Sequence, residues 1–111
     1  MKGTISVDIQ DECLYFIAKL KHANFNLPIE LIVYRNTIGD ISAICEDQGE
    51  YQIYSPEGKF IPDKTWVAQP IADSKIVKAH ADDSEGRYVE YNLLDHVDLN
   101  GYMDIEIRIY P

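Results

Sequence analysis

The stretch from Tyr102 to Tyr110 alternates regularly between two kinds of side chain. Its odd positions are aliphatic, and its even positions are charged or aromatic: Met103, Ile105, Ile107 and Ile109 against Tyr102, Asp104, Glu106, Arg108 and Tyr110. Side chains on a β-strand point alternately to opposite faces, so this pattern predicts a strand with one buried aliphatic face and one polar face. A helix would spread the isoleucines around its circumference.

Shorter stretches of the same kind recur along the chain. They predict strands at residues 4–9, 29–34, 41–45, 50–54, 75–81 and 87–94. Turn-forming residues separate them at 24–28, 55–58 and 82–86. The last of these turns predicts a hairpin between its two flanking strands. Residues 59–68 contain Pro62, which favours an edge strand or a loop lying across a sheet.

Residues 13–23 fit two structures. As a helix, the segment would be capped by Asp11 and would carry an apolar stripe that includes Phe16 and Leu20. As a strand, it would alternate like its neighbours and would form a hairpin with residues 4–9 through a turn at residues 10–12. The flanking strands favour the second interpretation.

The dipeptide Asn100-Gly101 precedes the last strand and indicates a hairpin turn. A two-residue loop would place polar residues opposite the buried row of that strand. A three-residue loop would pair Met103 with Leu99 and Ile105 with Val97, so we expect the longer loop. The alternative is a helical turn over residues 92–100, capped by Asn92 and ended by Gly101.

Eight or nine short segments with frequent turns define the expected fold class. The chain of 111 residues has the length of a single domain, residues 1–111. We expect a mainly β fold, a small antiparallel β-sandwich or barrel. The alternative is an α+β fold with one helix near residues 11–23.

The chain is acidic, with 19 Asp and Glu against 10 Lys and Arg and a net charge of −9. The net charge is zero over residues 1–36, −3 over 37–78 and −6 over 79–111. Such a charge disfavours direct binding of nucleic acid or of anionic membranes and favours a basic protein partner, or serves solubility alone.

The sequence gives no sign of export or membrane insertion. Residues 1–12 contain no apolar leader segment, and no apolar run approaches the ~20 residues of a membrane span. We therefore expect a cytoplasmic protein, or a mature chain from which a leader has been removed. Cys13 and Cys45 lie among apolar neighbours, where we expect buried thiols, with a single disulfide between them as the alternative.

Catalytic and metal-binding motifs are missing from the sequence. The three histidines, His22, His80 and His96, lack metal-ligand spacing and are expected in solvated loops. Asp104 and Glu106 form a carboxylate pair on one strand face, but such a face lacks the cleft that acid–base catalysis requires. We expect a protein that is not an enzyme and needs no cofactor or metal.

Tyrosines and carboxylates together indicate a binding surface. Tyrosine is enriched in binding hot spots, and the exposed side of the last strand carries two tyrosines around two carboxylates. The acidic turn at residues 82–86 adds further negative charge. The expected partner-binding residues are Asp82, Asp83, Glu85, Tyr102, Asp104, Glu106 and Tyr110.

Small size, acidity and absent catalytic motifs are shared with immunity proteins and nuclease inhibitors. The first hypothesis is therefore a non-enzymatic inhibitor that neutralises a basic partner, such as a toxin or nuclease, by covering its active-site cleft. A structural β-sandwich subunit that self-associates is the second. A small-ligand or carbohydrate-binding module that uses Trp66, Tyr51 and Tyr54 is the third.

Overall fold

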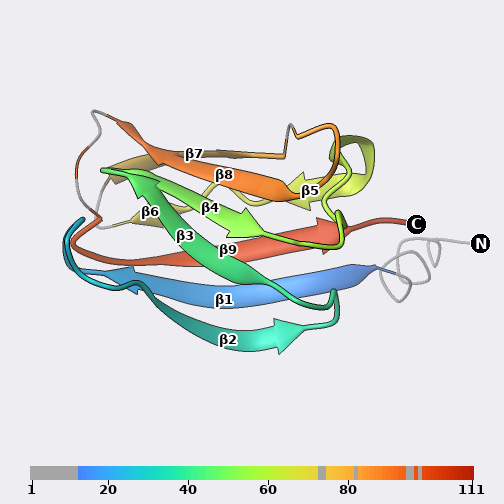
Figure 1. The fold of residues 1–111 in the computed structure, drawn as a ribbon, viewed down its shortest axis with the longest axis horizontal. Coiled ribbons are helices and arrows are strands. Elements are labelled where there is room, and N and C mark those ends of the chain that lie inside the picture. The colour runs from blue at the N-terminus through green and yellow to red at the C-terminus, as the bar shows by residue number, and fades with distance from the viewer. Residues whose placement is uncertain (1–12, 73–74, 82, 95–96, 98) are drawn as a thin grey trace, which may run out of the picture.

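The chain forms two antiparallel β-sheets packed face to face, as Figure 1 shows for the computed structural model. The structure describes residues 13–72, 75–81, 83–94, 97 and 99–111. The strand expected at residues 4–9 and the turn at 10–12 lie outside these residues. The expected mainly β fold of the sandwich type is confirmed.

The first sheet has four strands in the order β2-β1-β9-β5. Their bounds are Glu30–Asn36 for β2, Leu14–His22 for β1, Gly101–Ile109 for β9 and Thr65–Val67 for β5. The strand interpretation of residues 13–23 is confirmed, and a helix there is wrong. The reason is that β1 is flanked by β2 and β9, which satisfy its backbone groups while its alternate side chains enter the core.

The second sheet has five strands in the order β3-β4-β8-β7-β6. Their bounds are Ser42–Asp47 for β3, Glu50–Tyr54 for β4, Tyr88–Leu93 for β8, Lys75–His80 for β7 and Ile71–Ala72 for β6. The expected hairpin around residues 82–86 is confirmed, because β7 pairs with β8. The turn at 55–58 is also confirmed: the Gly58 amide donates to the Ser55 carbonyl at 3.1 Å.

The hairpin expected before β9 is wrong. β8 and β9 belong to different sheets, and β9 pairs instead with β1 along its whole length and with β5 at Ile107–Ile109. The connection crosses between the layers, and it buries Leu99 completely in the core. The predicted hairpin would also have buried Leu99. In the structure, however, Leu99 is buried because the connection crosses from one sheet to the other, which rules for pairing neighbouring strands do not predict.

The edge-strand prediction for residues 59–68 is confirmed. Pro62 begins a short 3-10 helix, η1 (Pro62–Lys64), and β5 follows it as the edge of the four-stranded sheet. Proline suits this place because its missing amide removes no ladder hydrogen bond.

The core lies between the sheets and is filled by alternate side chains of the central strands. The odd residues of β9 are buried, as its alternation predicts, and they pack with Phe16, Ala18 and Leu20 of β1. The other sheet contributes Tyr51, Ile53, Val77, Ala79, Val89, Tyr91 and Leu93. Cys13 is buried and Cys45 half-buried, and they form no disulfide.

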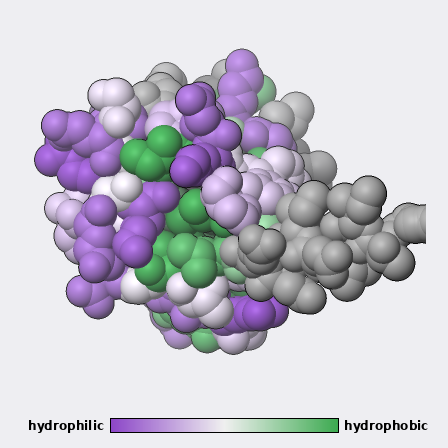
Figure 2. Space-filling model, turned by 90° about the vertical axis from the view of Figure 1, so that its right-hand side faces the viewer, coloured by the Kyte–Doolittle hydropathy of each residue, from purple (hydrophilic) through white to green (hydrophobic). Residues whose placement is uncertain are grey.

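Two loops approach each other closely at the end of the sandwich that carries the C-terminus. Gly58 and Gly86 both have positive φ, +68° and +73°, and a Cβ on Gly58 would lie 2.6 Å from the Glu85 carbonyl oxygen. The Phe60 amide donates to the Gly86 carbonyl at 2.7 Å. Figure 2 shows this end, where hydrophobic residues reach the surface among polar ones.

Candidate partner-binding surfaces

The structure divides the expected binding residues between the two layers. Tyr102, Asp104, Glu106 and Tyr110 lie along β9 and just beyond its end, in the four-stranded sheet. Asp83 and Glu85 lie in the turn between β7 and β8, in the five-stranded sheet. Asp82 lies outside the described residues. The two groups therefore belong to separate surfaces.

The first surface is the outer side of the four-stranded sheet, called here the four-stranded face. Strand register arranges it in rows across β5, β9, β1 and β2. The rows are Trp66–Arg108–Tyr15, Glu106–Ile17–Arg35, Asp104–Lys19–Ile32 and Tyr102–Lys21–Glu30. Trp66 is 43% and Tyr102 46% exposed, so this face is open to solvent.

Bases from distant parts of the sequence compensate the acids of this face. Lys19 and Lys21 of β1 lie directly beside Asp104 and Tyr102 of β9. Four bases and three acids occupy the rows, a net charge of +1 in a chain whose total is −9. The acids of β9 therefore do not form a negative patch of their own.

Several cations of this face are stacked on aromatic rings. The Lys19 ammonium lies 4.1 Å from the Tyr102 ring centre, and the Arg35 guanidinium lies 4.7 Å from that of Tyr15. Arg108 lies 4.8 Å from the Trp66 ring centre. Such contacts hold long side chains in defined positions, which lowers the entropy lost when a partner binds.

Arg108 is held further by a carboxylate on its own strand. Its Nε and Nη2 donate to Glu106 Oε2 at 3.0 and 2.8 Å. These hydrogen bonds raise the pKa of the Arg108 guanidinium above its ordinary value, so the side chain stays charged.

The second surface is the outer side of the five-stranded sheet with the β7–β8 turn, called here the acidic side. Among the residues that the structure describes there, acids outnumber bases by six to two: Glu46, Asp47, Glu50, Asp83, Glu85 and Glu90 against Lys78 and Arg87. The Tyr54 and Tyr88 rings stack in adjacent strands, with centres 5.1 Å apart. Tyrosines beside uncompensated carboxylates, expected on β9, thus occur here.

Internal contacts on the acidic side engage its few bases. Arg87 pairs with Glu85, and its Nε lies 3.7 Å from Asp83 Oδ2. His80 Nε2 lies 3.3 Å from Glu90 Oε2, and the Gln52 amide donates to Glu90 Oε1 at 3.3 Å. The Glu85 side chain remains 63% exposed, so it is available to a partner.

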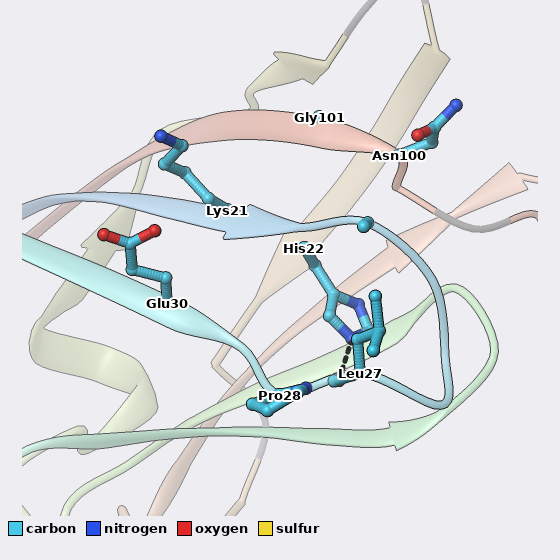
Figure 3. Close-up of a pocket in the computed structure, with 8 residues that line it drawn as sticks. Lys21, His22, Leu27, Pro28, Glu30, Asn100 and Gly101 are labelled. Carbon is cyan, nitrogen blue, oxygen red and sulfur yellow. Dashed lines mark hydrogen bonds between the residues drawn. The ribbon is translucent and has the colours of Figure 1, made fainter.

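An open pocket of about 480 Å³ lies between the β1–β2 loop and the start of β9. Figure 3 shows its lining, with Lys21 and Glu30 on neighbouring strands and the His22 ring turned toward Leu27. His22 is only 3% exposed, so its expected place in a solvated loop is wrong. The signal was present in the sequence, because His22 continues the inward alternation of Phe16, Ala18 and Leu20.

Both ring nitrogens of His22 have partners. Nε2 lies 2.7 Å from the Leu27 carbonyl oxygen, and Nδ1 lies 2.6 Å from the Tyr51 hydroxyl. A carbonyl only accepts, so Nε2 carries the proton, and in the neutral ring Nδ1 accepts from Tyr51. His22 therefore fastens the β1–β2 loop to β4 of the opposite sheet, a structural role.

Tyr91 contrasts with its neighbour Tyr51, which it faces across β4 and β8. Its hydroxyl is buried and has no hydrogen-bond partner among the described residues. Burial raises the pKa of the Tyr91 hydroxyl well above its ordinary value.

Sites of other chemistry are not assembled in the described part of the chain. No three histidine, cysteine or acidic side chains there come together as metal ligands. Trp66, Tyr51 and Tyr54 do not share a surface, because Tyr51 is buried and the other two lie on opposite sheets. The described residues also include no helix with the length and apolarity of a membrane span.

Comparison of the chain with protein-family models, curated protein sequences and solved structures gave no match.

Proposed function

We propose that this chain is a non-enzymatic binding domain that neutralises a basic protein, such as a toxin or nuclease, by covering its active-site cleft. The observation that carries the proposal is the segregation of charge. Among the described residues, the acidic side holds six acids against two bases around the Tyr54–Tyr88 pair, whereas the four-stranded face is balanced. A basic cleft is complementary to the acidic side only.

The contact residues of this proposal lie on the β7–β8 hairpin and the adjoining strand. Glu85 and Glu90 offer carboxylates to Lys or Arg side chains, and Tyr54 and Tyr88 offer aromatic surface between them. The net charge of −9 adds long-range attraction that speeds encounter and weakens with ionic strength.

The test compares two variants with the same change in total charge. Glu85→Lys with Glu90→Lys alters the acidic side, while Glu30→Lys with Asp63→Lys alters acids outside it. Tagged proteins are used to capture partners from host lysate at low and high salt, and the captured protein's activity is then assayed with and without the chain. Circular dichroism verifies that each variant is folded.

We expect the wild-type chain to capture one basic protein at low salt and to inhibit the activity of that protein. The first variant should fail to capture it, and the second variant should still capture it. Equal capture by both variants would show that total charge rather than this surface governs binding. Capture without inhibition would refute neutralisation.

A further inference from the structure

The four-stranded face has a charge pattern that is complementary to itself. Two of its four bases lie on β1, which has no acid on this face, and two of its three acids lie on the neighbouring β9, with Lys19 directly beside Asp104. A two-fold axis parallel to the strands, lying in the contact plane between β1 and β9, would place β1 of each copy over β9 of the other. Positions along the strand are preserved by this rotation, so each row meets the same row.

In three of the four rows, this superposition joins complementary groups; in the remaining row, Ile17 meets the second copy's Glu106, which stays paired with its own Arg108. Lys19 meets the second copy's Asp104, and Tyr15 meets the second copy's Arg108. Lys21 meets the second copy's Tyr102, a further cation–aromatic contact. Every contact occurs twice, because the interface is isologous.

We propose that two copies of this chain pair through their four-stranded faces in this arrangement. The aromatic and arginine side chains of the rows are those most common in interface hot spots. Cations already stacked on Tyr15, Tyr102 and Trp66 are ordered before association, which favours pairing.

The alternative surface opposes self-association. Contact between two acidic sides would bring together two surfaces whose described acids outnumber their bases by six to two. Like charges placed opposite each other in an interface disfavour binding. The four-stranded face, with its net charge of +1, avoids this repulsion and leaves both acidic sides of the pair open to other proteins.

The size of the face indicates a moderate affinity. β1 and β9 have nine residues each, and with strand spacing of ~4.8 Å and a rise of ~3.4 Å the sheet covers roughly 500 Å². Two copies would bury about 1,000 Å² in total if the faces are treated as flat, without the additional area of protruding side chains. This area is at the lower end of the range for specific protein interfaces. We therefore expect a weak, reversible dimer.

The experiment is sedimentation equilibrium of the purified protein from about 1 μM to 1 mM, for wild type, Lys19→Glu, Asp104→Lys and an equimolar mixture of the two variants. Each variant alone places like charges at both two-fold-related contacts, and its dimer dissociation constant should rise at least about tenfold. In the mixture, opposite charges meet at both contacts, so a heterodimer should form. Lys78→Glu, on the acidic side, is the matched control and should not disrupt the dimer.

Restored association in the mixture supports the proposed axis specifically, because general loss of stability cannot be rescued by mixing. A wild-type protein that stays monomeric at every concentration overturns the proposal. So does a dimer that both variants form as well as wild type, or one that the mixture does not restore. The measurement uses the pure chain, so its outcome is independent of the proposed basic partner.

Discussion

Tyr51 and Tyr91 provide a matched pair for testing the account of the core. Both are buried, they face each other across β4 and β8, and each loses only its hydroxyl on substitution by phenylalanine. The Tyr51 hydroxyl lies 2.6 Å from His22 Nδ1, whereas the Tyr91 hydroxyl has no partner among the described residues. The same chemical change should therefore alter stability in opposite directions.

The magnitudes follow from the cost of burying polar groups. Tyr51→Phe removes a hydrogen bond and leaves a buried ring nitrogen unsatisfied, which should lower the free energy of unfolding by about 2 kcal/mol. Tyr91→Phe removes an unsatisfied hydroxyl and should raise it by about 1 kcal/mol. Near Tm, each kcal/mol corresponds to roughly 4–8 °C for a domain of about this size.

The assay is urea unfolding followed by the fluorescence of Trp66 and by circular dichroism. The denaturation midpoint should fall for Tyr51→Phe and rise for Tyr91→Phe, with an unchanged m value. Tyr54→Phe, at a half-buried outward position of β4, is the control and should change stability by less than about 0.5 kcal/mol. If Tyr91→Phe destabilised the protein as much as Tyr51→Phe, the assignment of hydrogen bonds in this part of the core would be refuted.

Three further predictions concern pH, a turn and the core. Because burial raises the pKa of Tyr91, only the unfolded state ionises at this residue just above pH ~10. The stability of wild type relative to Tyr91→Phe, measured by parallel urea unfolding, should therefore be constant below pH ~10 and fall above it by up to about 1.4 kcal/mol per pH unit. Gly58→Ala should cost about 1–3 kcal/mol, because its φ is +68° and its Cβ would lie 2.6 Å from the Glu85 carbonyl; a thermal midpoint equal to wild type would contradict this. Ile107→Ala should cost about 2–5 kcal/mol by loss of fully buried surface in the centre of the core, measured by the shift in urea midpoint, and a smaller loss would mean that the core collapses around the site.

The local elements were predictable because they depend on residues close in sequence. Alternation in the last strand follows from a side-chain period of two, and the turns at 55–58 and 82–86 follow from proline, glycine and acidic residues. The hairpin before β9 failed for the opposite reason. Its register was consistent locally, but β9 found β1, a strand about eighty residues earlier, as a partner.

The candidate surfaces show the same division. The sequence placed Asp104 and Glu106 on one exposed strand face, and the structure has them there. It did not indicate that Lys19 and Lys21 lie beside that strand, nor that Asp83 and Glu85 belong to the other sheet. The distribution of charge along the chain therefore identified the acid-rich segments of the sequence, but it did not predict which surface of the folded protein is acidic.

By itself, the sequence determined a mainly β fold, the positions of most strands and the side of most strands that is buried, because backbone sterics and hydrophobic periodicity act within a few residues. Only the tertiary structure decided which strands are neighbours. Strand pairing depends on the joint packing of both sheets around one core, and that choice put bases beside the acids of β9 and gathered the uncompensated acids on the opposite layer.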